Sequence, residues 1–166
     1  IETRRSCRKY LAKQITDEEL NAVLRAGTFA PTGMGLQSPF IVAVQQEQMK
    51  ERLAAMNAAV RGKNGNPYYD APTYVLVFAP TDCPFAIQDG TCVLENMMLA
   101  AHALGLASCW INREIEMFAT EEGKQVMKEM GLPEGLGGIG AIALGYPATT
   151  PANPKPRKEG YARIIR

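Results

Sequence analysis

The segment from Ile87 to Leu104 is the feature that most constrains the fold of this chain. Apolar residues occupy nearly the whole circumference of a helix drawn through it, at Val93, Leu94, Met97, Met98, Leu99, Ala100, Ala101 and Leu104. A helix that is apolar on most sides is buried on most sides. In a chain of 166 residues, this pattern predicts a central helix, part of which is covered by a second subunit.

Caps, apolar periodicity and turn residues predict the other elements. The residues Thr16 to Glu19 form a capping box, so a helix is expected over 17–28, and further helices over 46–60 and 121–130. Short apolar strands are expected over 40–44, 73–79, 106–111 and 139–144, with loops over 30–39 and 61–72. No repeat or linker divides the chain, which predicts one α+β domain over residues 1–166.

Charge and cysteine spacing exclude several function classes. The 18 basic and 17 acidic residues leave a net charge of +1, which gives no reason to expect a nucleic-acid partner. The four cysteines form no C-x-x-C pair and His102 is the single histidine, so common zinc sites are not expected and no metal is predicted. Reduced thiols fit a cytoplasmic protein. The longest apolar stretch is too short to cross a membrane, and His102 has no neighbouring nucleophile that would suggest a hydrolytic triad.

The glycines between Gly135 and Gly140 match G-x-G-x-x-G. A dinucleotide fingerprint must follow a strand and open a helix, whereas here the glycines precede an expected strand and no helix follows. A Rossmann site is therefore disfavoured, and a phosphate site in this chain would have to be built from side chains.

Two basic groups lie at the ends of the chain. Arg4, Arg5, Arg8 and Lys9 fall within the first ten residues, and a helix over 2–10 would put Arg4 and Arg8 on one face, near Ser6. Near the other end, Lys155 and Arg157 alternate in a proline-rich segment, so both would point to one side. Guanidinium groups match phosphate oxygens. The alternative, which the pattern alone favours, is two solvated charge runs.

Several motifs in the same order resemble the nitroreductase family of FMN-dependent oxidoreductases. They are Arg4-Arg5-Ser6-Cys7-Arg8-Lys9-Tyr10, Ala30-Pro31-Thr32 followed by Gln37, Ala100 to Leu106 followed by Ser108-Cys109-Trp110-Ile111, Gly145-Tyr146-Pro147, and Lys155-x-Arg157. The resemblance implies a central mixed sheet surrounded by helices. It also implies a domain-intertwined homodimer with two FMN sites at the interface.

The resemblance also assigns roles to residues. Arg4, Ser6, Lys155 and Arg157 would hold the FMN phosphate, and Arg8 would lie near flavin N1 and O2. The partner chain would contribute Pro31 and Thr32, backbone groups near Asn112 and Arg113 would lie by N5, and Asn64 would reach the pyrimidine end. The full set of candidate cofactor-binding residues is Arg4, Arg5, Ser6, Arg8, Pro31, Thr32, Gly33, Gln37, Asn64, Asn112, Arg113, Lys155 and Arg157. Among the cations, Arg5 and Lys9 are expected to be solvated.

The implied reaction is a ping-pong cycle. NADH or NADPH would reduce FMN, which would then reduce a nitroaromatic, quinone or similar small-molecule acceptor. Flavin N5 would carry the hydride, so no catalytic side chain is expected. The alternatives are a flavin-binding protein without turnover, and the same fold used for reductive dehalogenation or oxidation by O2.

The chain departs from the family pattern in two places. Gly35 stands where an asparagine is common, and Ser38-Pro39 follows Gln37 where Pro-Trp is common, so one polar contact to the flavin would be lost. The short stretch between Ile111 and Glu121 leaves little room for a lid helix.

Overall fold

A computed structural model describes residues 1–166. The elements in chain order are α1 (Asp17–Thr28), the short 3-10 helix η1 (Gly33–Gly35), β1 (Phe40–Val44), α2 (Glu47–Arg61), β2 (Thr73–Pro80), α3 (Ala86–Ala103), β3 (Ala107–Ile111), α4 (Glu114–Ala119), α5 (Glu121–Glu129) and β4 (Leu136–Gly145). The predicted helices and strands are confirmed to within about three residues. The six-residue helix α4 was not predicted; it lies between Ile111 and Glu121, the stretch in which the sequence leaves little room for a lid helix.

The four strands form one sheet in the order β1-β2-β4-β3, in which every neighbouring pair is antiparallel. The expectation of a mixed sheet is therefore corrected within this chain. Its one parallel pairing is an isolated bridge between Ser6 and Ser108 at the outer edge of β3. The register between β2 and β4 shifts at Val77/Phe78, where Ile139 is the extra residue.

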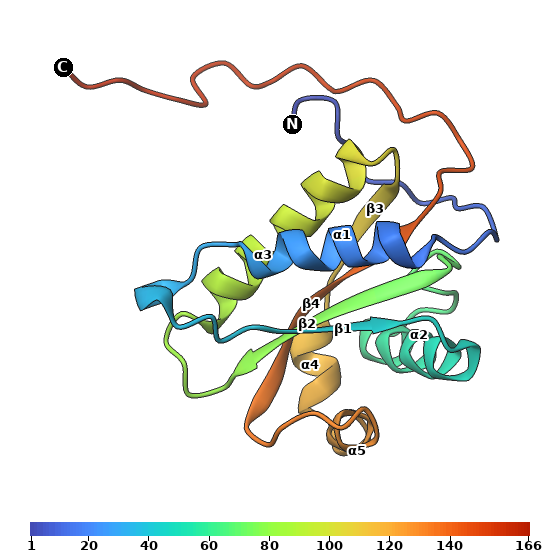
Figure 1. The fold of residues 1–166 in the computed structure, drawn as a ribbon. Coiled ribbons are helices and arrows are strands. Elements are labelled where there is room, and N and C mark those ends of the chain that lie inside the picture. The colour runs from blue at the N-terminus through green and yellow to red at the C-terminus, as the bar shows by residue number, and fades with distance from the viewer.

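The sheet is buried on both faces. Along β2 the side chains alternate, so that Tyr74, Leu76 and Phe78 enter one core whereas Val75 and Val77 enter the other. Helices α2, α4 and α5 contribute to the first core, and α1 and α3 to the second (Figure 1). A strand covered on both faces has no polar side to show, which explains the continuous apolar run that marked β2 in the sequence.

The capping box at the start of α1 is confirmed. Thr16 Oγ1 accepts from the Glu19 backbone N–H at 3.2 Å, and a Glu19 carboxylate oxygen accepts from the Thr16 backbone N–H at 2.8 Å. The same carboxylate accepts from Tyr146 Oη at 2.7 Å. Because of these hydrogen bonds, the pKa of Glu19 is lowered, and the N-terminus of α1 is tied to the end of β4.

Residues 2–10 are not helical, which corrects the expectation that Arg4 and Arg8 share a helix face. The segment follows the open edge of β3, where the Cys7 backbone N–H donates to Ser108 O at 3.0 Å. Tyr10 fixes its far end, since its hydroxyl lies 2.8 Å from Cys7 O and 3.1 Å from Ala143 O. An unpaired strand edge offers backbone partners that a short helix cannot use.

The glycines of the G-x-G-x-x-G match lie at the start of and within β4, not in a phosphate-binding turn. Gly138 is required there, because a Cβ built on it would lie 2.4 Å from the carbonyl oxygen of Glu114. Gly138 occupies a variable position of the match, and its lack of a side chain reflects the close approach of α4 to β4.

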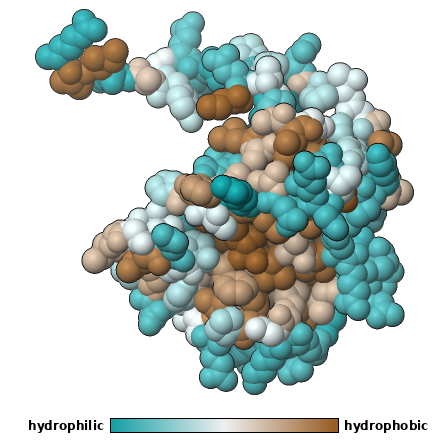
Figure 2. Space-filling model, viewed as in Figure 1, coloured by the Kyte–Doolittle hydropathy of each residue, from teal (hydrophilic) through white to brown (hydrophobic).

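Apolar side chains remain exposed on the domain. The large exposed ones near the η1 loop and the start of α3 are Phe29, Met34, Leu36, Phe40 and Ile87. Figure 2 shows apolar side chains gathered across the middle of this face and at the free end of the C-terminal tail. The tail, residues 151–166, is exposed throughout and runs away from the domain (Figure 1). No helix is long and apolar enough to cross a membrane.

Candidate functional site

The cationic N-terminal segment borders a cavity of about 490 Å³. Arg5, Ser6 and Arg8 line it from this segment, and Pro147 and residues 149–152, which lead into the tail, line it as well. The end of α3 contributes His102, whose Nε2 lies 2.8 Å from Thr3 Oγ1. The structure thus brings one of the two basic groups to a hollow in the surface.

Two guanidinium nitrogens in this segment have no hydrogen-bond partner although they are buried. They are Arg4 Nη1 and Arg5 Nε. Arg5 also donates from Nη1 to Arg4 O, and its side chain is half-buried, so the expectation that Arg5 is solvated is wrong. Buried donors are normally satisfied, and a guanidinium suits phosphate oxygens. These unpaired donors therefore fit an anionic ligand such as a phosphate.

Arg8 has a defined partner in Tyr69. Arg8 Nε donates to Tyr69 Oη at 3.3 Å, and the guanidinium carbon lies 5.8 Å from the centre of the Tyr69 ring. The hydrogen bond that Arg8 donates to Tyr69 is the main cause of a raised pKa at Arg8, so the side chain remains a cation. Tyr69 thereby orients the one candidate residue that is expected to act on flavin charge.

A tight turn between α2 and β2 presents Tyr69 to Arg8. Asn66 holds the turn, because its Oδ1 accepts from the Tyr68 backbone N–H and its Nδ2 donates to Asp70 Oδ1, each at 2.8 Å. Tyr69 and Asp70 both have positive φ values, 57° and 53°. The backbone is therefore held in a sparsely populated region. Tyr68 is fully buried in the first core, whereas Tyr69 is half-buried, packs against that core and accepts the hydrogen bond from Arg8.

The Asn112–Arg113 turn joins β3 to α4. Arg113 has φ 86° and is the N-cap of α4, an unusual setting for an arginine. Asn57 Nδ2 donates to Asn112 O at 2.9 Å and lies 3.3 Å from Glu114 Oε1. Glu114 Oε1 also accepts from Tyr68 Oη at 2.9 Å. Hydrogen bonds among Asn57, Tyr68 and Glu114 thus hold the turn in place.

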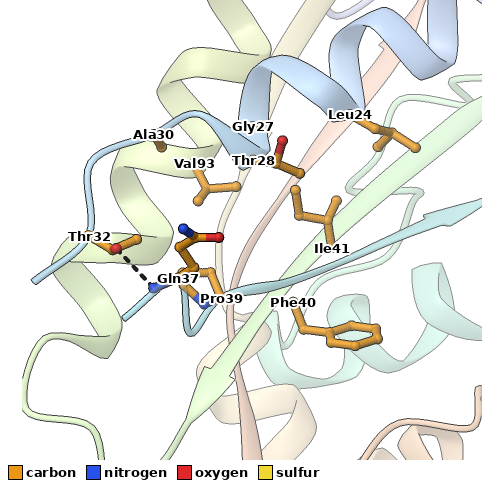
Figure 3. A pocket seen from close by; sticks show the side chains of 10 residues that line it. All are labelled: Leu24, Gly27, Thr28, Ala30, Thr32, Gln37, Pro39, Phe40, Ile41 and Val93. Carbon is orange, nitrogen blue, oxygen red and sulfur yellow. Dashed lines mark hydrogen bonds between the residues drawn. The ribbon is translucent and has the colours of Figure 1, made fainter. Parts of the chain in front are cut away.

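The loop with Pro31, Thr32, Gly33 and Gln37 is tied to α3. Asp89 Oδ1 accepts from the Gly33 backbone N–H at 2.9 Å, and a Cβ on Gly33 would lie 2.4 Å from the Phe85 ring. The Gln37 backbone N–H donates to Thr32 Oγ1 at 3.0 Å. The loop borders a cavity of about 340 Å³, in which the Gln37 side chain points toward Val93 (Figure 3). The loop is therefore held in place without a ligand.

The structure does not assemble all candidate residues within one chain. The η1 loop and the N-terminal segment lie at opposite ends of the domain in Figure 1. Asn64 is exposed in the loop between α2 and β2, where it borders a separate hollow beside α2. Lys155 and Arg157 are exposed on the tail, and Arg157 donates from Nη2 and Nε to Lys155 O at 2.6 and 3.2 Å.

Several residues around the site were missed from the sequence, namely Asn57, Tyr68, Tyr69, Asp89 and Glu114. Asp89 is only 5% exposed, but the sequence does not single it out, because the same helix also carries the carboxylate of Glu95. Asn57, Tyr68 and Glu114 meet from three separate segments, and no local pattern indicates that contact.

The sequence pattern of the nitroreductase family matches residues 1–146. The chain therefore belongs to the nitroreductase family and is an oxidoreductase of that class. It is 32% identical over 155 residues to a protein of Archaeoglobus fulgidus that is named as an NADH dehydrogenase/NAD(P)H nitroreductase. The alignment covers 89% of this chain and 83% of the relative.

Solved structures show the same fold. A nitroreductase of Bacteroides fragilis with bound FMN aligns with a TM-score of 0.88 and 36% identity, covering 98% of this chain and 95% of that one. A nitroreductase of Desulfitobacterium hafniense with bound FMN also aligns with a TM-score of 0.88, at 25% identity, over 99% and 95% of the two chains.

Proposed function

We propose that this chain is an FMN-dependent NAD(P)H oxidoreductase that works as a homodimer in the cytoplasm. The observation that carries the proposal is the pair of buried, unpaired guanidinium nitrogens of Arg4 and Arg5, the second of which belongs to a residue that lines the N-terminal cavity. The similar proteins of Bacteroides fragilis and Desulfitobacterium hafniense hold FMN. When bound, FMN supplies hydride transfer from NADH or NADPH to a small acceptor such as a nitroaromatic or a quinone in a ping-pong cycle.

The N-terminal segment and the tail would both contribute residues that bind the cofactor. Arg4, Arg5 and Ser6 would bind the phosphate from one side, and Lys155 and Arg157 on the tail would approach it from another. Arg8, oriented by Tyr69, would place its positive charge where reduction adds negative charge, near N1 and O2.

The Asn112–Arg113 turn would lie at N5. Backbone N–H groups and carbonyls are the groups that a turn can offer there, and Asn57 already holds the Asn112 carbonyl. The positive φ of Arg113 is consistent with a functional turn, because unusual backbone conformations cluster at ligand sites. Asn64 would reach the other end of the ring system from its exposed loop.

A second subunit would complete each site. The η1 loop lies far from the N-terminal segment of its own chain (Figure 1), so Pro31, Thr32, Gly33 and Gln37 would cover the cofactor of the partner. The exposed side chains of Phe29, Met34, Leu36, Phe40 and Ile87 would be buried in the interface, as would those of Tyr161, Ile164 and Ile165 on the tail. The exposed tail suits an intertwined dimer.

The first test is the absorbance spectrum. The purified protein is expected to be yellow, to release FMN rather than FAD on denaturation, and to lose its flavin absorbance when NADH or NADPH is added without oxygen. Mass spectrometry identifies the released cofactor. Bound FAD, or no flavin at all, contradicts the proposal, whereas FMN that no nicotinamide reduces would indicate a binding protein without turnover.

The second test concerns the tail. A chain truncated after Thr150 is expected to lose both dimerisation and FMN, because it lacks Lys155, Arg157 and the apolar side chains of Tyr161, Ile164 and Ile165. Analytical ultracentrifugation at micromolar concentration measures the first effect and flavin titration the second. The matched control is full-length Tyr161→Ser, which keeps both cations. A truncated chain that remains a flavin-loaded dimer would disprove the role of the tail.

A further inference from the structure

The carboxyl group of Glu114 is buried and is not used by the proposed function. Its residue is fully buried, with 0% of its surface exposed. Oε1 accepts from Tyr68 Oη at 2.9 Å and from Asn57 Nδ2 at 3.3 Å, whereas Oε2 is buried and has no hydrogen-bond partner. An unsatisfied buried oxygen is costly, so the group calls for an explanation.

No cation neutralises this carboxyl. The four salt bridges of the chain all lie elsewhere, at Lys50–Glu47, Arg52–Glu122, Arg52–Glu129 and Lys124–Glu121. The polar groups that face it are Tyr68 from the turn before β2, Asn57 from α2 and, as the one further charged group, Glu116 on α4, while β4 presents Gly138. Burial, with a smaller contribution from Glu116, raises the pKa of Glu114 to about 7.

The same carboxyl is joined to the Asn112–Arg113 turn. Asn57 Nδ2 is shared between Glu114 Oε1 and Asn112 O, and Glu114 directly follows Arg113, whose φ is 86°. A change in the charge of the carboxyl would therefore affect the backbone of the turn in two ways. It would act through the hydrogen bonds of Asn57 and through the peptide bond that joins Glu114 to Arg113.

We infer that Glu114 is a positioning residue for the Asn112–Arg113 turn, and that its carboxyl takes up one proton from solvent when the cofactor bound against that turn gains negative charge. The inference rests on the proposed function, which puts the flavin N5 edge at the turn and takes a hydride, hence two electrons, from NADH or NADPH. The proton goes to the carboxylate, whose charge it cancels. In a low-dielectric interior an added negative charge favours the neutral form of a nearby acid.

Infrared difference spectroscopy of the FMN-loaded full chain tests the proton uptake. At a pH just above 7, reduction is expected to produce the carbonyl band of a protonated carboxylic acid in the wild type. The band is expected to be absent in Glu114→Gln, which keeps the size and one acceptor oxygen of the side chain. Glu116→Gln, an exposed acid on the same helix, is the matched control and should retain the band.

The pH dependence of the midpoint potential gives a second readout. If reduction by two electrons takes up one extra proton, the equilibrium constant of the reduction changes tenfold per pH unit. This corresponds to a change of about 30 mV in the midpoint potential. Just above pH 7 the potential of the wild type should fall by about 30 mV per pH unit more steeply than that of Glu114→Gln. Tyr68→Phe keeps the ring stacked on Tyr74 but removes a hydrogen bond that favours ionised Glu114, so the steep segment should move to higher pH.

The outcomes separate this inference from the proposed function. Wild-type protein without bound flavin overturns the proposed function. Wild-type protein with bound flavin that gives the same band and the same slope as Glu114→Gln overturns the role of Glu114. If Glu114→Gln does not fold, a Tyr68→Phe variant whose pH profile is unchanged overturns it instead, since a merely structural hydrogen bond would not shift a titration.

Discussion

Gly138→Ala is expected to destabilise the protein by about 3 kcal/mol, at the upper end of the cost of overpacking a core. A Cβ at this position would lie 2.4 Å from the carbonyl oxygen of Glu114 and 2.7 Å from the Phe118 ring. The obstacle is backbone, so relief requires α4 to move away from β4. Urea-induced unfolding at a fixed protein concentration measures the loss.

Gly137→Ala is the matched control on the same strand. Its Cβ would come within 3.0 Å of Thr81 Cγ2, the end of an exposed side chain that can rotate away, so a cost below about 1 kcal/mol is expected. Equal destabilisation by the two variants would show that the close approach of α4 to β4 does not set the effect. In Gly138→Ala the displaced α4 should also disturb the Asn112–Arg113 turn and weaken flavin binding.

Arg4→Ala and Arg8→Ala are expected to fail in different ways. A charge-assisted hydrogen bond contributes about 1.5–3 kcal/mol, so loss of Arg4 should weaken FMN binding about ten- to hundredfold and leave the potential nearly unchanged. Loss of Arg8 should lower the midpoint potential by a few tens of millivolts, with about 30 mV for each 1.4 kcal/mol, because the reduced cofactor loses a counter-charge.

The control for both variants is Lys9→Ala, since Lys9 is an exposed cation of the same segment. Fluorescence titration of FMN and a redox titration measure the two effects. Three equal, small losses would mean that the segment is only a solvated charge run, which is the alternative that the sequence pattern left open. Arg5 is not a suitable control, because its Nε is buried without a partner.

The elements with local signals were predictable from the sequence. The capping box fixed the start of α1, and the continuous apolar run of β2 reflected a strand covered on both faces. The segment 2–10 was predicted wrongly as a possible helix, because the charge spacing of Arg4 and Arg8 fits a helix face. The open edge of β3, which decides its conformation through Ser108, is visible only in three dimensions.

Candidate residues could be named from the sequence where a family motif carries them, and not where they depend on contacts between segments. Arg4, Ser6, Asn112 and the η1 loop were named from the resemblance, and their roles remain predictions. Glu114 could not be found in this way, because its hydrogen-bond partners Asn57 and Tyr68 lie 57 and 46 residues away. Contacts of such sequence separation leave no periodicity to detect.

The turn that ends at Asp70 limits where insertions and deletions can occur in homologous chains. Tyr68 is 0% exposed and donates a hydrogen bond to Glu114, while its half-buried neighbour Tyr69 accepts one from Arg8. Inserting or deleting one residue between Asn66 and β2 would displace both side chains, so both contacts would be lost together. Length differences among homologous chains should therefore accumulate before Asn66, over residues 61–65, where every side chain is exposed. Between Asn66 and Thr73 the spacing should be kept, even where the residues themselves differ.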